Sequence, residues 1–188
     1  MTTDQQIPSK AELLDALRSG EQEALAKLGA LSEEALEIGR YESGWNGRQI
    51  LAHFASIEWT YPRLLDMAKQ AASNSAPPSA SDTSTDAGAD AAASQPEDKR
   101  PAGRMAGGID GYNQRQVDKR AQASVAELLE EFQRNRTATI AAVESADESL
   151  LLTPITSAGG ISGALSQVLM AVSVLHVRGH VDDIVGSS

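Results

Sequence analysis

The spacing of the apolar residues is the strongest constraint on the fold, because they recur every three or four positions along most of the chain. This spacing places them on one face of an α-helix. It covers four long stretches, at about residues 10–31, 46–65, 124–146 and 162–183. No segment longer than a few residues alternates apolar and polar side chains, as a half-buried strand would. The sequence therefore predicts an all-α fold in which four main helices form a four-helix bundle.

Polar residues mark where these helices begin. Three pairs have the spacing of a capping box, in which each side chain accepts from the other residue's backbone amide: Ser9 with Glu12, Asn46 with Gln49, and Ser124 with Glu127. Ser162 is the expected cap of the last helix. Pro62 lacks an amide donor, so we expect the second helix to kink or restart there. Residues 32–39 and 108–120 are expected to add shorter helical turns.

The composition changes abruptly between residues 71 and 103. Ala, Ser, Asp, Thr, Pro and Gly dominate this stretch, which holds no Val, Ile, Leu, Met or aromatic residue. Such a segment buries too little apolar area to offset the entropy of ordering it. We therefore expect a flexible loop at about 71–103, between the second and third helices of a single domain that spans residues 1–188.

Bulk properties exclude several classes of partner. The net charge of −10 would repel a phosphate backbone, so no nucleic-acid partner is expected. No apolar run approaches the roughly 18 to 20 residues needed to cross a bilayer, so no membrane partner is expected either. The N-terminus lacks the pattern of an export signal, which favours a cytoplasmic location. The chain has no cysteine, so any thiol chemistry needs a thiol from another molecule.

All three histidines of the chain lie on predicted apolar helix faces. His176 and His180 are four positions apart and continue the apolar face of the last helix, and His53 lies between Ile50 and Ile57 on the second. A single histidine on a helix face is more often an ordinary packed residue than a ligand, but three buried imidazoles need partners for their ring nitrogens. Three neutral imidazoles suit zinc, nickel or ferrous iron and leave coordination positions open.

Asp183, Arg178 and Trp59 lie close to the histidines in the sequence. Asp183 follows His180 by three residues and is the candidate catalytic residue, which would orient an imidazole or accept a proton. Its alternative role is that of a solvated aspartate near a helix end. Arg178 is expected to face away from the metal. Trp59 is expected in the core.

Two segments carry a resemblance to a known family. The stretch "GWNGRQILAHFASIEWTYPRLL" and the terminal "VLHVRGHVDDI" resemble the two ends of the metal site in the DinB/YfiT-like superfamily, and "YNQRQVDKRAQASVAELLEEF" is similar to the start of its third helix. The likeness extends from about residue 11 to 184. It implies a four-helix bundle with a long crossover between helices two and three, a homodimer, and a divalent metal on His53, His176 and His180.

The superfamily includes damage-inducible proteins of unclear activity, bacillithiol transferases and mycothiol-dependent maleylpyruvate isomerases. The resemblance therefore implies a metal-dependent enzyme that activates a small-molecule thiol, or water, for transfer to a small electrophile in detoxification or the stress response. Two alternatives stay open from the residues alone. One is a metal-binding helical bundle without catalytic activity, and the other is a dimerisation module whose histidines hold no metal.

Overall fold

The computed structural model describes residues 6–41, 44–75 and 108–186. In chain order, its helices are α1 (Lys10–Gly29), α2 (Glu33–Leu36), α3 (Gly47–Glu58), α4 (Pro62–Ser75), α5 (Gly108–Lys119), α6 (Val125–Ser145), α7 (Glu148–Leu151), α8 (Leu165–Leu169), the π-helical segment η1 (Met170–Leu175) and α9 (His176–Val185). Two short strands, β1 (Pro154–Thr156) and β2 (Ser162–Ala164), are the other elements of the described residues. The prediction of a helical protein is confirmed, with one exception.

That exception is the hairpin of β1 and β2, which lies where the sequence predicts a polar connection between the third and last helices. The strands pair antiparallel, with Ile155 opposite Gly163. The turn between them is closed by Ser157, whose hydroxyl accepts from the amide of Ile161 at 3.1 Å, and by Gly160, whose φ of +82° favours glycine. The expected cap Ser162 is therefore wrong, because it lies in a strand. The helix begins at Leu165 instead.

The other helix ends follow the predictions closely. All three capping boxes form, and they open α1, α3 and α6. The second predicted helix is divided at Pro62, which opens α4 as a first helical residue where its missing amide costs nothing. The expected flexible loop is wrong over residues 71–75, because α4 continues to Ser75. Its remaining residues, 76–103, lie outside the described residues.

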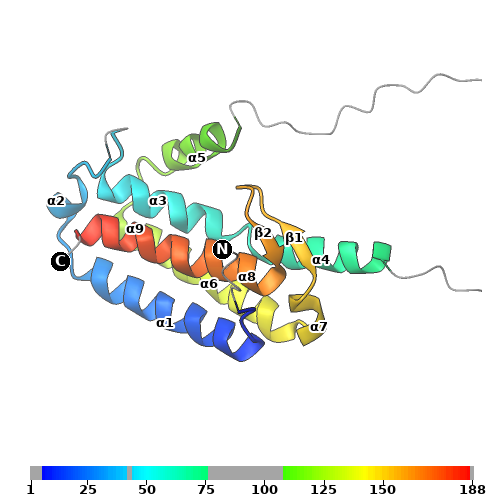
Figure 1. The fold of residues 1–188 in the computed structure, drawn as a ribbon. Helices are drawn as coiled ribbons and strands as arrows, with labels where there is room; N and C mark the ends of the chain where they lie inside the picture. The colour runs from blue at the N-terminus through cyan, green and yellow to red at the C-terminus, as the bar shows by residue number, and fades with distance from the viewer. Residues whose placement is uncertain (1–5, 42–43, 76–107, 187–188) are drawn as a thin grey trace, which may run out of the picture.

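The long helices lie side by side and enclose the core. Helix α3 contacts α6 and α9, and α1 contacts the same two, while α5 lies on the outer side of α3 (Figure 1). One buried apolar cluster, at the end with the hairpin, includes Leu13, Leu17, Leu65, Val143, Leu165 and Leu169. A second, towards the other end of α1 and α3, includes Leu28, Ile50, Phe54, Leu128, Phe132 and Val181. Each such side chain contributes about 1.5–3 kcal/mol by leaving water.

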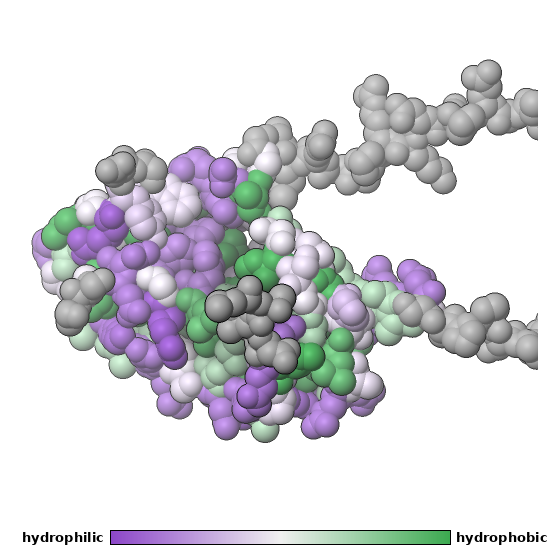
Figure 2. Space-filling view, in the orientation of Figure 1, coloured by the Kyte–Doolittle hydropathy of each residue, from purple (hydrophilic) through white to green (hydrophobic). Residues whose placement is uncertain are grey.

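The surface of the protein differs between the hairpin and α3. Figure 2 shows apolar side chains gathered on the part of this face that carries the hairpin, whereas hydrophilic ones cover most of the part over α3. Trp59 is also at the surface, with 38% of its area exposed, so its expected core position is wrong. Its ring lies under the guanidinium of Arg63 at 3.9 Å. None of the described helices is long and apolar enough to cross a membrane.

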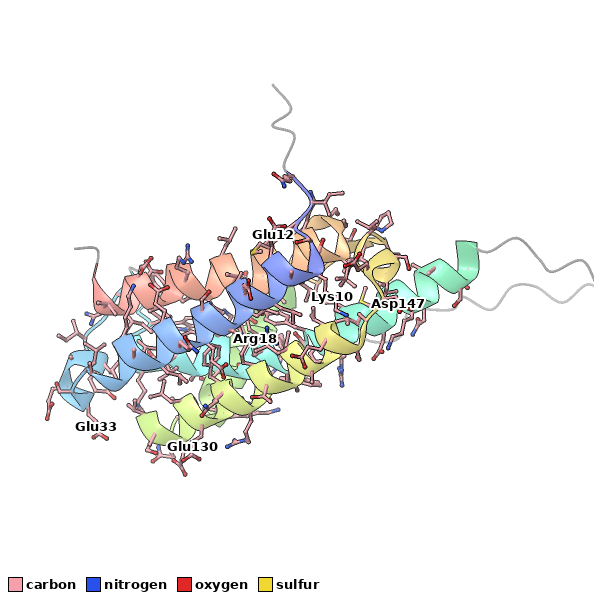
Figure 3. The ribbon with its side chains drawn as sticks, turned by 90° about the horizontal axis from the view of Figure 1, so that it is seen from below. Lys10, Glu12, Arg18, Glu33, Glu130 and Asp147 are labelled. Carbon is pink, nitrogen blue, oxygen red and sulfur yellow. The ribbon has the colours of Figure 1, made fainter. Side chains whose placement is uncertain are left out.

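Lys10 ties the start of α1 to the end of α6. Its ammonium donates to the carbonyls of Glu144 and Ala146, both at 2.7 Å (Figure 3). These carbonyls lie at a helix C-terminus, where a cation is favourable. The neighbouring pair of Arg18 and Glu144 is half-exposed and is expected to contribute less than about 1 kcal/mol.

Two glycine substitutions test this packing. A Cβ on Gly47 would lie 3.1 Å from the backbone oxygen of Leu36 and 3.3 Å from Ile184, whereas a Cβ on Gly20 in α1 meets nothing within 4 Å. We expect Gly47→Ala to lower the free energy of unfolding by about 1 kcal/mol. Gly20→Ala should raise it by about 0.5–1 kcal/mol, because alanine is the better helix former. Urea denaturation of both variants measures the difference, and equal effects would contradict the packing.

Candidate metal centre

The three histidines meet between α3 and α9. His53 comes from the middle of α3, and His176 and His180 come from successive turns of α9. The His53 ring lies 5.7 Å from that of His176 and 5.1 Å from that of His180, measured between centroids. One ligand nitrogen of each residue lies within 4.8 Å of the other two. The predicted convergence of residues distant in sequence is therefore confirmed.

The separation of the nitrogens fits a metal ion. The Nε2 atoms of His176 and His180 are 3.2 Å apart. Two imidazole nitrogens bound at 2.0–2.1 Å in a tetrahedral zinc site are separated by about 3.3 Å. In addition, the buried Nδ1 of His53 has no hydrogen-bond partner among the described residues. An unpartnered buried nitrogen is costly, and a cation bound by the cluster would add a favourable interaction for this imidazole.

The three imidazoles differ in their access to solvent. His53 is buried, with 4% of its area exposed, His180 is half-buried and His176 is exposed. The expectation that all three point into the core is therefore correct only for His53. Among the described residues, the cluster meets solvent at His176.

The π-helical segment explains why His176 and His180 do not lie on the apolar face predicted for the last helix. In a regular helix, the buried Leu165 and Leu169 would be followed on the same face by His176 and His180. A π-helical turn holds more residues, and η1 advances the register by one position, a rotation of about 100°. Val177 and Val181 take the core positions instead. The two histidines then lie beside the core face, towards α3.

Burial holds the histidines in their neutral form. Burial, together with the neighbouring imidazoles of His180 and His176, lowers the pKa of His53 to about 3. Burial, helped by His176, lowers the pKa of His180 to about 4, and partial burial of its ring lowers the pKa of His176. Near neutral pH these rings carry no charge, so each can offer a nitrogen lone pair to a cation.

Tyr41 orients His180. Its hydroxyl lies 2.9 Å from Nδ1 of His180 and donates to Oδ2 of Asp183 at 2.6 Å. A phenol has a single hydrogen, so the proton between His180 and Tyr41 belongs to Nδ1, an assignment made from the bonding pattern. This leaves the lone pair on Nε2, the atom that faces His176. Ligating histidines commonly donate their second nitrogen to such a partner.

Asp183, the predicted catalytic residue, acts on this cluster through Tyr41. Its side chain is exposed, and its Oδ2 lies 3.7 Å from Nδ1 of His180, beyond hydrogen-bonding distance. Burial and the bond to Asp183 raise the pKa of Tyr41, which keeps the phenol protonated. The position of Asp183 agrees with the orienting role, while proton transfer by Asp183 stays a prediction. Arg178 lines a small cavity beside Gly20 of α1 and faces away from the histidines, as expected.

Aromatic rings surround the buried side of the cluster. The ring of Trp45 lies 5.2 Å from that of His53, and its Nε1 donates to the amide oxygen of Gln114 on α5 at 3.0 Å. Phe54 lies nearly parallel to His180, at 6.4 Å. These contacts fix two of the imidazoles by packing. Trp45 thereby links the cluster to α5.

No sequence pattern points to Tyr41 as a residue of the site. It lies in the irregular segment between α2 and α3, and it is 139 positions from His180. Its bond to His180 depends on the path of that segment across the end of α9. No local pattern predicts such a path.

The fold and the site define a helical protein with a three-histidine cluster able to hold a metal ion. A model of the DinB superfamily matches residues 16–181, so the chain belongs to the DinB superfamily. Comparison with curated proteins gave no significant match, and neither did comparison with solved structures.

The lowered histidine pKa values predict a pH-dependent stability for protein kept in chelator. Below about pH 6.5 the unfolded chain binds protons on its histidines and the folded chain does not, so the free energy of unfolding falls as the pH falls. For His53, with a pKa of about 3, the loss reaches about 2 kcal/mol between about pH 6.5 and 5. Urea titrations across this range measure it. His53→Gln stays neutral and should show a smaller decline, and an equal decline would contradict the assignment.

Proposed function

We propose that the chain binds one divalent cation, zinc, nickel or iron, on His53, His176 and His180. The observation that carries the proposal is the convergence of three neutral imidazoles, two of whose Nε2 atoms are 3.2 Å apart. The hydrogen bond of Tyr41 supports it, and so does the Nδ1 of His53, which lacks a partner among the residues that the structure describes. The unit that holds the ion is, in this proposal, a single domain built as a four-helix bundle from α1, α3, α6 and the helical run from α8 to α9, with a crossover between α4 and α5.

We further propose that the protein is an enzyme, a metal-dependent thiol S-transferase or hydrolase that acts on a small electrophile in detoxification or the stress response. The bound ion would supply an activated nucleophile, either a thiol or water, near neutral pH. Three protein ligands are typical of sites that keep an open position. The exposed edge at His176 gives that position access to small molecules. Because the chain lacks cysteine, the thiol would be a small molecule.

Residues of the chain have distinct tasks in this proposal. Tyr41 and Asp183 hold His180 in one tautomer and one orientation. Trp45 and Phe54 keep water from the inner side of the cluster, which strengthens electrostatic interactions there. Their rings also offer an apolar wall to the electrophile. The homodimer and the cytoplasmic location stay predictions.

A second candidate function is a metal-binding module without catalytic activity. It is favoured by the scarcity of acid and base groups, since the cluster of candidate ligands among the described residues contains the histidines and no carboxylate. Asp183, the nearby acid, is already bonded to Tyr41. Turnover that depends on the histidines separates the two functions.

Metal analysis tests the proposal directly. We expect the purified protein to hold about one equivalent of zinc, nickel or iron, and His176→Ala to lose most of it together with any consumption of a thiol by a generic electrophile. Arg178→Ala, on the other side of α9, should keep both. Elemental analysis and a thiol-consumption assay are the measurements. Metal without histidine-dependent turnover would favour the module, and no metal under any loading condition would refute the site.

The role of Tyr41 is tested by its removal. Tyr41→Phe and Asp183→Asn should each weaken metal binding by about 10- to 100-fold, because His180 loses its orienting partner. Asp182→Asn is the matched control, since Asp182 contacts Lys27 on α1 at 3.3 Å and does not contact the cluster. Competition with a chromophoric chelator gives the affinities. Equal affinities in all three variants would argue against the orienting role.

A further inference from the structure

A buried ion pair lies next to the π-helical segment. Arg136 of α6 and Glu58, the last residue of α3, have side chains that are 1% and 0% exposed. The guanidinium Nη2 donates to Oε2 of Glu58 at 2.9 Å, and Nε lies 2.9 Å from Oε1. Both residues occupy apolar helix faces, four positions after Phe54 and Phe132 respectively. Two charges at such positions need a specific reason.

The pair is bonded to the backbone of η1. Arg136 donates from Nη2 to the carbonyl of Ser173 at 2.5 Å, and the hydroxyl of Ser173 donates to Glu58 at 3.2 Å. Next to it, the hydroxyl of Tyr61 donates to the carbonyl of Val172 at 2.7 Å. A π-helical turn replaces the regular bonding pattern of the α-helix and is less favourable. Side-chain donors from other elements at two successive carbonyls make this register the favoured one.

This register sets where the histidines point. Ser173 is three residues before His176, and Glu58 is five residues after His53 in the same helix. One bonded network therefore joins the helix that carries His53 to the segment that orients the other two imidazoles. Without the extra residue in η1, α9 would be rotated by about 100° and would direct His176 and His180 away from their present positions.

We propose that Arg136 and Glu58 are positioning residues of the metal centre, which hold the π-helical register that directs the two C-terminal histidines towards His53. The inference rests on the proposed metal site. Stability alone does not call for the pair, because buried ion pairs can often be replaced by apolar side chains of similar volume at little cost. What an apolar replacement lacks is a donor for the carbonyl of Ser173.

The test is the double variant Arg136→Met with Glu58→Leu, which leaves no lone buried charge. We expect it to fold, to bind zinc about ten-fold or more weakly in chelator competition, and to show a Co²⁺ absorption spectrum different from that of the three-histidine site. The control is Arg120→Met with Glu131→Leu. That pair is less buried, with side chains 18% and 23% exposed, and it is well bonded, with Nη2 and Oε1 2.5 Å apart, but it makes no bond to η1 among the described residues. It should leave affinity and spectrum unchanged.

A folded double variant with the affinity and the Co²⁺ spectrum of the unmodified protein would overturn the inference. If the double variant does not fold, Tyr61→Phe decides, because it removes only the hydroxyl that bonds Val172. A loss of zinc affinity of about three-fold or more supports the inference, and an unchanged affinity overturns it. Failure of the unmodified protein to bind zinc, nickel or iron would instead refute the proposed metal site itself.

Discussion

The ion pair of Arg136 and Glu58 is the interaction on which the proposed arrangement of the three histidines depends. Two buried charges are expensive to desolvate, and here they compensate each other while also bonding the backbone of η1. The pair joins α3, α6 and the C-terminal helical run at one point. Because these elements carry or orient all three histidines, this contact determines the geometry of a site about one helical turn away along α3 and along the C-terminal helical run.

The buried histidine cluster lowers the stability of the metal-free protein in acid, and a bound cation would compensate for this loss. Burial lowers the pKa values of its imidazoles, so the protein gives up stability in acid to keep them neutral. A neutral imidazole is also the form that binds a metal. The desolvation that weakens the metal-free protein is therefore the property that prepares the ligands.

The cluster is supported differently on its two sides. On the α3 side, His53 is fixed by burial and by the ring of Trp45, and its Nδ1 has no hydrogen-bond partner in the part of the chain that the structure describes. On the α9 side, His180 is fixed by the chain of bonds through Tyr41 to Asp183, and His176 stands at the solvent edge. In the proposed metal site, His53 would be the buried ligand, His180 the ligand oriented by hydrogen bonds and His176 the exposed ligand. This asymmetry suits a site that exchanges small molecules.

The sequence by itself determined the starts of α1, α3 and α6 and the candidate ligands, because capping pairs and apolar periodicity act over three or four residues. The sequence also contains an indication of the buried ion pair, since Glu58 and Arg136 occupy positions on apolar helix faces. Only the tertiary structure decided the hairpin, the bond from Tyr41 and the register of η1. The register is set by Arg136 and Tyr61, which lie 37 and 111 positions from the carbonyls they bond, and no local pattern encodes contacts over such separations.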